Sequence, residues 1–391
     1  ARALFEQAAA LALRAQPASG ARESQVETAL IAYNWLCSIA LTEDDYAAAR
    51  GYVDEGLRMC QPLKKRLSEM IFRTDLMDIA QARGEYAVAR HHGEAALHLA
   101  RTLGYLRGEN HLKLAIAEVA RLQGEYGYAQ ELIDQALTAH HTFGDLLGEA
   151  GAMNDSGYLQ LLMGNLLGAQ HWFDRWEQTL RAAELLARES FQGILRLALL
   201  AHAAGDYAEA LRYAEDGWRM ACQLDGRASQ ANALVILGMA HAGLRQLEQA
   251  ASAYSQALDF YTALEHLHKA AEPRAGLAQI ALAQGDLPRA RAQAEAMLAA
   301  LETRPYVGVE RPFAIYLACY QVLAATNDAR AAGVLHMARR RLQEYASHIP
   351  DRALRQSFLE NVPAHQALLR AYAALPAEEY TSGLGPGGVA L

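Results

Sequence analysis

The amino-acid sequence predicts an all-α solenoid in which antiparallel helix pairs are stacked one after another along the chain. A short motif recurs about every 40 residues over most of the 391-residue chain, and a fixed repeat of this length is typical of stacked repeat proteins. Small residues recur at constant positions within each repeat, which marks places where helix axes cross closely. β-Branched residues, which favour strands, are scarce beside Ala and Leu.

The recurring motif is a turn between two helices, and it is most complete where Gly124, Glu125 and Tyr126 are followed by Ala129. Glycine readily adopts the positive φ that ends a helix, and the acidic residue can cap the next helix by accepting backbone N–H bonds. The aromatic ring packs beneath the turn, and the closing alanine lets two helices approach closely. Each unit is therefore a helix A, a tight turn, a helix B and a looser connection. The motif closes at Ala49, Ala89, Ala129, Ala169, Ala210, Ala250, Ala290 and Ala332.

Taken in order, the chain begins with an apolar pattern over residues 1–15, which predicts an unpaired leading helix equivalent to a helix B without its helix A. The first residue is not Met, which we interpret as the sign of a piece excised from a larger protein. Residues 24–345 predict eight helix pairs. Residues 346–375 predict two capping helices over the last apolar face, the first starting at Asp351 or Pro350 and the second at Pro363. Residues 376–391, with four glycines and no periodicity, predict a flexible tail.

The combination of a small residue, a Gly-Asp-Tyr turn such as residues 205–207 and a closing Ala resembles the tetratricopeptide repeat over residues 24–345. The usual unit of that family has about 34 residues, so the present units are longer. The resemblance implies a right-handed superhelix whose A helices line a concave groove. Long units of this kind, together with residues 349–365, also resemble the helical-repeat regions of bacterial signalling ATPases and of transcription regulators of the maltose-regulon-activator type. This second resemblance implies a regulatory sensor region.

Composition argues against several classes of protein. The net charge is −8 and only four residues are lysine, whereas a nucleic-acid-binding surface needs a concentrated basic footprint. We therefore expect no direct nucleic-acid binding. An uninterrupted apolar run of membrane-spanning length is missing, as is a signal peptide. The cysteines are scattered without a C-x-x-C motif, which favours free thiols in a reducing cytoplasm.

The sequence contains none of the short motifs that usually carry chemistry. A P-loop, a nucleophile elbow, a dinucleotide-binding turn and an H-E-x-x-H zinc motif are all missing. The adjacent pairs His91-His92 and His140-His141 point to different sides of a helix, which is poor geometry for one metal ion. We therefore expect a protein that is not an enzyme and that has no cofactor and no metal site.

Function is expected in the groove that the resemblance implies. Asn34 and Asn154 share the helical position at which, in tetratricopeptide repeats, an amide often clamps a peptide backbone. Other units carry apolar residues at that position, so a continuous ladder is missing. Arg121 is expected to be solvated and to bind an acidic group near the centre of the groove. The predicted groove residues are Asn34, Ser38, Thr74, Asp78, Gln81, His111, Glu118, Arg121, Asn154, Tyr158, Gln192, His202 and Asn232, with Glu272 and Gln279 farther along.

Three aromatic residues, Trp172, Phe173 and Trp176, fall within five positions of one predicted helix B. One interpretation is that they fill space left by small neighbouring residues. The alternative is an aromatic contact patch for a partner.

The sequence thus predicts a non-catalytic module that binds a protein or peptide partner, or a small inducer. The favoured interpretation is the regulatory region of a multidomain bacterial signalling ATPase or transcription regulator. One alternative is a freestanding scaffold or signalling-peptide receptor. Another is a repeat partner that controls an attached protease or cyclase.

Overall fold

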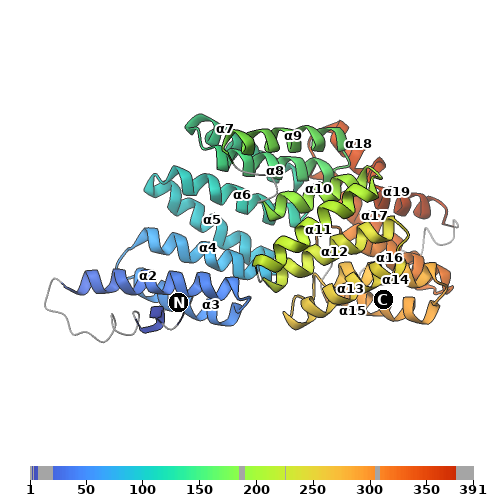
Figure 1. The fold of residues 1–391 in the computed structure, drawn as a ribbon, viewed down its shortest axis with the longest axis horizontal. Coiled ribbons are helices and arrows are strands. Elements are labelled where there is room, and N and C mark those ends of the chain that lie inside the picture. Colours follow the sequence, from blue (N-terminus) through green and yellow to red (C-terminus); the bar gives the residue numbers. More distant parts are fainter. Residues whose placement is uncertain are drawn as a thin grey trace, which may run out of the picture. The chain divides into compact units, whose positions relative to one another are not determined.

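The computed structural model describes residues 2, 4–7, 21–184, 190–224, 226–303 and 309–375. Within these ranges all regular secondary structure is helical, and consecutive helices pack as antiparallel pairs (Figure 1). The predicted all-α solenoid of tetratricopeptide type is therefore confirmed. The predicted tail at 376–391 and most of the predicted leading helix at 1–15 lie outside the described residues.

Each predicted unit corresponds to a helix A followed by a helix B, and two shorter helices come after the last unit. In chain order, the A and B helices of the units are α2 (Ala21–Thr42) and α3 (Tyr46–Cys60), α4 (Arg66–Ala82) and α5 (Tyr86–Leu103), α6 (Leu106–Leu122) and α7 (Tyr126–Phe143), α8 (Leu146–Leu162) and α9 (Leu166–Ala182), α10 (Phe191–Ala203) and α11 (Tyr207–Leu224), α12 (Arg227–Gly243) and α13 (Leu247–Ala263), α14 (Ala271–Ala283) and α15 (Leu287–Thr303), and α16 (Pro312–Ala325) and α17 (Arg330–Ser347). The last two helices are α18 (Arg352–Glu360) and α19 (Pro363–Ala373). None of the helices in the described ranges is both long and apolar enough to cross a membrane.

The turn between helices A and B has the conformation that the motif predicts. Gly124 has a φ of 81°, and Arg245, which occupies the same place in a weaker copy of the motif, has a φ of 62°. The following residue often caps the next helix, as when Asn165 accepts a hydrogen bond from the Gly168 amide at 3.1 Å. The turn is therefore kept even where glycine is replaced.

Large rings in one helix pack against glycines of a neighbouring helix. Trp176 of α9 is 2% exposed, and a Cβ atom at Gly193 of α10 would overlap its indole. Tyr254 of α13 lies between Gly238 and Gly276 in the same way. Since protein interiors are close-packed, each pairing of a large ring with a glycine fixes how neighbouring helices cross.

The chain divides into two compact units, residues 1–119 and 120–391, which are described separately. In the first unit, the described part of the N-terminal segment packs on the first helix pair. The Phe5 ring stacks on Trp35 of α2 with centroids 6.0 Å apart, and Arg2 pairs with Glu43 at 2.9 Å. The described N-terminal residues therefore contact the first helix pair, although Trp35 stays 52% exposed.

In the second unit, the last helices lie against the first ones (Figure 1). The Tyr126 ring meets the rings of Tyr345 and Phe358 edge-on, with centroids 5.9 and 5.7 Å apart. The Gly127 amide donates a hydrogen bond to the carbonyl of His348 at 2.9 Å. The end of this unit therefore covers the turn at its start, although more than two hundred residues separate them in sequence.

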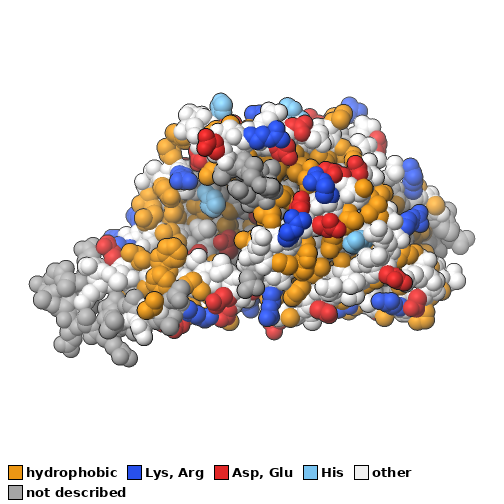
Figure 2. Space-filling view, in the orientation of Figure 1, with side chains coloured by type: hydrophobic (Ala, Val, Ile, Leu, Met, Phe, Trp, Pro, Cys, Tyr) orange, Lys and Arg blue, Asp and Glu red, His pale blue; other side chains and the backbone are white. Residues whose placement is uncertain are grey.

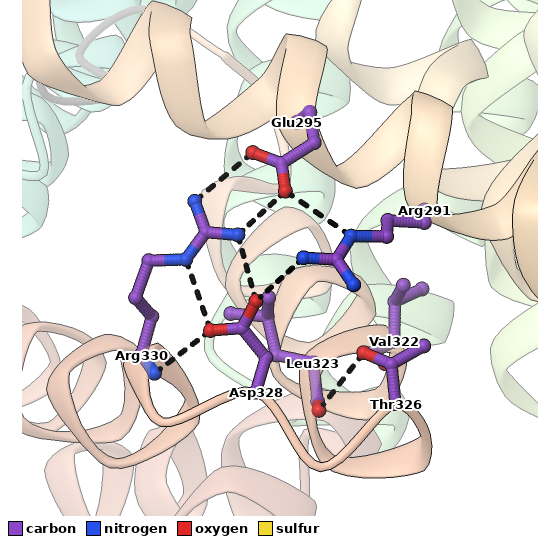
Figure 3. Close-up of polar contacts among 7 residues, drawn as sticks. All are labelled: Arg291, Glu295, Val322, Leu323, Thr326, Asp328 and Arg330. Carbon is purple, nitrogen blue, oxygen red and sulfur yellow. Dashed lines mark hydrogen bonds and ion pairs between the residues drawn. The ribbon is translucent and has the colours of Figure 1, made fainter.

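The last of the repeated turns is held by four alternating charges (Figure 3). Arg330 donates to Asp328 and Glu295, and Arg291 reaches Asp328 at 3.1 Å. Hydrogen bonds from Arg330 lower the pKa of Asp328. These contacts tie α15 to the turn between α16 and α17. The arginines are partly exposed, so each pair is expected to stabilise by only about 1 kcal/mol or less.

The close helix crossings can be tested at Ala210 of α11, which is 1% exposed, against Ala208, which is exposed on the same helix. We expect Ala210→Leu to overpack the crossing and to lower the free energy of unfolding by about 1–3 kcal/mol. Ala208→Leu should change it by less than about 0.5 kcal/mol. Urea unfolding of both variants measures the difference, and equal midpoints would place the crossing elsewhere.

The closure of the second unit can be tested at Phe358, which is fully buried and contacts Tyr126. We expect Phe358→Ala to destabilise the second unit by about 3–5 kcal/mol because it leaves a cavity. The Gly127 amide, which is bonded to His348, should then exchange its hydrogen faster. The exposed Arg352→Ala on the same helix is the control, and unchanged exchange at Gly127 in Phe358→Ala would contradict the closure.

Candidate ligand-binding face

Side chains from successive A helices of the second unit converge on the short segment Val309–Arg311, which directly precedes α16. We call this surface the A-helix face. Its residues contact Glu310 or Arg311 directly, or are linked to Glu310 through Tyr158 and then Arg196. They are Arg121 of α6, Asn154 and Tyr158 of α8, Arg196 of α10, Met239 of α12 and Glu272 of α14.

Glu310 binds to the first part of this face. Both Arg121 guanidinium nitrogens Nη1 and Nη2 donate to the Glu310 carboxylate, the latter at 3.2 Å. The Tyr158 hydroxyl donates to Oε2 of the same carboxylate at 2.9 Å. Burial by itself raises the pKa of Glu310. The charge and hydrogen bonds of Arg121 outweigh this effect and hold the pKa of Glu310 below its usual value. Glu310 is therefore an ionised acceptor at neutral pH.

Tyr158 lies between two guanidinium groups. The Cζ atoms of Arg121 and Arg196 are each 4.7 Å from the centroid of its ring, within the range of cation–π attraction. Burial, and then the charge of Glu310, raises the pKa of Tyr158 well above its usual value. The phenol therefore stays protonated and acts as a hydrogen-bond donor to the carboxylate.

Arg196 connects Tyr158 to the polar residues of α8. It donates to Asp155 at 2.6 Å and to the Oδ1 atom of Asn154. Asn154 is 5% exposed, and its Nδ2 atom has no hydrogen-bond partner among the described residues. A buried amide donor without a partner costs free energy unless a ligand or water accepts its hydrogen bond.

Arg311 binds to the other part of the face. Its backbone amide donates to Oε1 of Glu272 at 3.1 Å, its Nη2 atom donates to Oε2 at 2.9 Å, and its Nη1 atom contacts the Met239 sulfur. Burial by itself lowers the pKa of Arg311, but the charge and hydrogen bonds of Glu272 outweigh this effect and raise the pKa above its usual value. Burial, and then the charge of Arg311, lowers the pKa of His202 to about 4, so this imidazole is neutral at pH 7.

The structure changes the prediction for Arg121. The sequence predicts a solvated base awaiting an acidic group, whereas Arg121 is 7% exposed and already holds the carboxylate of Glu310. The physical reason is tertiary. The connection before α16 places a carboxylate on the A helices, and a buried guanidinium needs such a counter-ion.

Glu310 and Arg311 themselves escape the sequence prediction, because they lie in a loop and not on an A helix. Their only signal is an adjacent pair of opposite charges, between an apolar Val309 and the helix-starting Pro312, in a connection longer than most of the others. Three other predicted residues of this unit lie on the same A helices but outside the contacts with Glu310 and Arg311. Gln192 is exposed at the start of α10, Asn232 is half-buried on α12, and Gln279 is exposed on α14.

The other predicted groove residues belong to the first unit, where Gln81 of α4 donates to Glu118 of α6 at 2.8 Å. The Thr74 hydroxyl donates to the Met70 carbonyl of its own helix. Asn34 is half-buried, and Ser38 and His111 are exposed.

Carboxylates gather on α4 of the same unit. Partial burial raises the pKa of Asp75 to about 6. Partial burial, and then the charges of Asp75 and Glu118, raises the pKa of Asp78 to about 7. Asp78 is therefore partly protonated at neutral pH, unlike an ordinary aspartate.

The three aromatic residues of α9 lie in two different environments. Phe173 and Trp176 belong to the core, where Phe173 packs on Gly157 and Trp176 on Gly193. Trp172 is half-buried, and the Cζ atom of Arg175 lies 5.0 Å from its ring centroid. Only Trp172 of the three therefore presents an appreciable ring surface to solvent.

Charges of both signs are interspersed on the face of the molecule shown in Figure 2. On that face acidic and basic side chains lie in small groups, between exposed apolar side chains.

Comparison with known proteins shows that the fold is similar to that of Rap proteins of known structure. Neither a protein-family model nor a curated protein sequence matches the chain. The Rap conjugation gene regulator of plasmid pLS20, solved with the Phr* peptide, has a TM-score of 0.56 at 14% identity, over 72% of this chain and 79% of that chain. A Rap protein in complex with Competence and Sporulation Factor has a TM-score of 0.52 at 12% identity, over 88% and 96% of the two chains. At such identity the similarity shows a shared tetratricopeptide-like fold.

The carboxylates of the first unit generate a prediction for pH. The pKa of Asp78 in the folded state, about 7, lies above its pKa in the unfolded state. At a pH between these two pKa values, the folded protein keeps a proton on Asp78 that the unfolded protein has released. The stability of the first unit should therefore fall as the pH rises from 5 to about 8.

Asp78→Asn removes this titration, so we expect it to raise the thermal midpoint at pH 8 and to leave it nearly unchanged at pH 4. Differential scanning calorimetry across this range measures both. Asp54→Asn on the exposed surface of α3 is the control. A wild-type midpoint that rises steadily to pH 8, with no gain in Asp78→Asn, would contradict the shifted pKa.

Proposed function

We propose that this chain is a non-catalytic repeat module that binds a peptide or an extended protein segment. One observation carries the proposal. The A-helix face already holds two adjacent residues of its own chain, Glu310 and Arg311, through their side chains and one backbone amide. A face that binds a non-helical segment of this chain has the donors and acceptors needed to bind such a segment from a partner.

The chemistry of the face supports a peptide over a compact apolar ligand. It offers a buried cation at Arg121, a largely buried anion at Glu272 and a phenol donor at Tyr158. The unpartnered Nδ2 atom of Asn154 can donate to a peptide carbonyl. Peptides present carbonyls, amides and charged side chains together, so one extended segment can satisfy all of these groups.

The structural neighbours support the same ligand class. Two of them were solved in complex, one with the Phr* peptide and one with Competence and Sporulation Factor. In keeping with the resemblance to signalling ATPases and transcription regulators, we propose that peptide binding here has a regulatory output, as in a sensor region. A freestanding signalling-peptide receptor is the second candidate, and it is favoured by a match that spans 96% of the Rap chain bound to its factor.

Binding can be tested with peptides selected on the immobilised chain from a random dodecapeptide library and then resynthesised. We expect isothermal titration calorimetry to show saturable binding, with affinity reduced about tenfold or more in Asn154→Ala, because a buried hydrogen bond to the ligand is lost. Tyr158→Phe, which keeps the ring and removes the donor, should bind more weakly than wild type if its hydroxyl serves the ligand.

Glu131→Ala is the matched surface control, since Glu131 is exposed on α7. The proposal fails if no selected peptide binds, or if Asn154→Ala binds every peptide as tightly as Glu131→Ala does.

A further inference from the structure

We propose that Glu310 and Arg311 are an internal ligand of the A-helix face, and that the external partner is a peptide carrying an acidic residue directly followed by a basic residue. This inference rests on the proposed function and names the chemistry of its ligand. It follows from the way in which the face pairs each of the two charges.

The carboxylate of the internal ligand is bound by geometry that selects a carboxylate. Two guanidinium nitrogens of Arg121 meet the two oxygens of Glu310, and the Tyr158 hydroxyl adds a third donor. Paired donors on a planar guanidinium match the two oxygens of a carboxylate, and charge-assisted hydrogen bonds of this type are strong. A neutral amide in place of Glu310 would lose the ionic part of this recognition.

The cation is bound by a second and separate group of residues. Glu272 of α14 accepts hydrogen bonds from both the guanidinium and the backbone amide of Arg311, and Met239 of α12 contacts the same guanidinium. The backbone contact fixes the position of the chain, whereas the side-chain contact selects its charge. An apolar residue in the position of Arg311 would leave the Glu272 carboxylate without a cation.

The order of the two charges is also selected. Adjacent residues reach different ends of the face, because Glu310 contacts α6 and α8 whereas Arg311 contacts α12 and α14. A segment with the charges reversed would place a cation beside Arg121 and a carboxylate beside Glu272. Like charges brought together at a poorly solvated site oppose binding, which is how charge order produces specificity.

Burial explains why a displacing partner must carry both charges. Arg121 is 7% exposed, and the Glu272 side chain is 14% exposed. Removing the partner of a buried ion is costly, so departure of Val309–Arg311 is favourable only when another carboxylate and another cation replace it. The internal segment is also tethered, so it competes at a high effective concentration and lowers the apparent affinity for the external peptide.

The test uses a synthetic peptide, acetyl-Ala-Val-Glu-Arg-Pro-Ala-amide, and its charge-reversed counterpart with Arg before Glu. The double variant Glu310→Ala/Arg311→Ala removes the internal ligand from the A-helix face. We expect its affinity for the first peptide to be at least about tenfold higher than that of wild type. The reversed peptide should bind the double variant about tenfold or more weakly than the first peptide does. Glu131→Ala should bind like wild type.

Circular dichroism establishes that the double variant is folded. If it is not, the conservative Glu310→Gln replaces it, and the first peptide should again bind more tightly than to wild type. If the first peptide binds wild type and the double variant with equal affinity, the proposal of an internal ligand is wrong. If the double variant binds the two peptides with equal affinity, the proposed charge order is wrong. The proposed function survives both results if library peptides still bind and Asn154→Ala still weakens them, whereas it fails with the inference if no peptide binds any variant.

Discussion

Close approach of neighbouring helices at small side chains is the constraint on which the rest of the structure depends. The closing alanines of the motif, such as Ala129 and Ala250, are fully buried where helices A and B cross. Where a large ring occupies the interface instead, a glycine faces it, as Gly193 faces Trp176. Because each crossing is fixed by this complementarity, successive pairs stack with little freedom, and distant residues of the second unit are brought to defined positions.

The stacking in the second unit has two consequences that a single helix pair could not produce. Helices near the end of the unit return to its beginning, where Tyr345 and Phe358 cover Tyr126. The connection before α16 places Glu310 against Arg121, which precedes it by almost two hundred residues. Both contacts close the unit on itself, the first through aromatic rings and the second through charges.

The charges of the A-helix face can be buried because they are matched. Arg121 with Glu310, and Arg311 with Glu272, form pairs whose members come from different helices or loops. An arrangement of this kind stabilises little by itself, since desolvation offsets much of the attraction, but it discriminates strongly between ligands of different charge. A surface of this type is better suited to recognition than to structural support, which agrees with the proposed binding function.

The sequence by itself determined the helical class, the repeat and most helix boundaries, because turn glycines, capping residues and small crossing residues act locally and recur. It also placed Arg121, Asn154 and Tyr158 on A helices, since their positions follow from the same repeat. Only the tertiary structure decided what these residues contact. The partner of Arg121 is a loop residue, and loops outside the repeat carry no period from which their position can be predicted. The burial of Arg121 likewise depends on that distant loop. The sequence therefore predicted a solvated base, whereas packing in the folded chain makes Arg121 a buried and paired one.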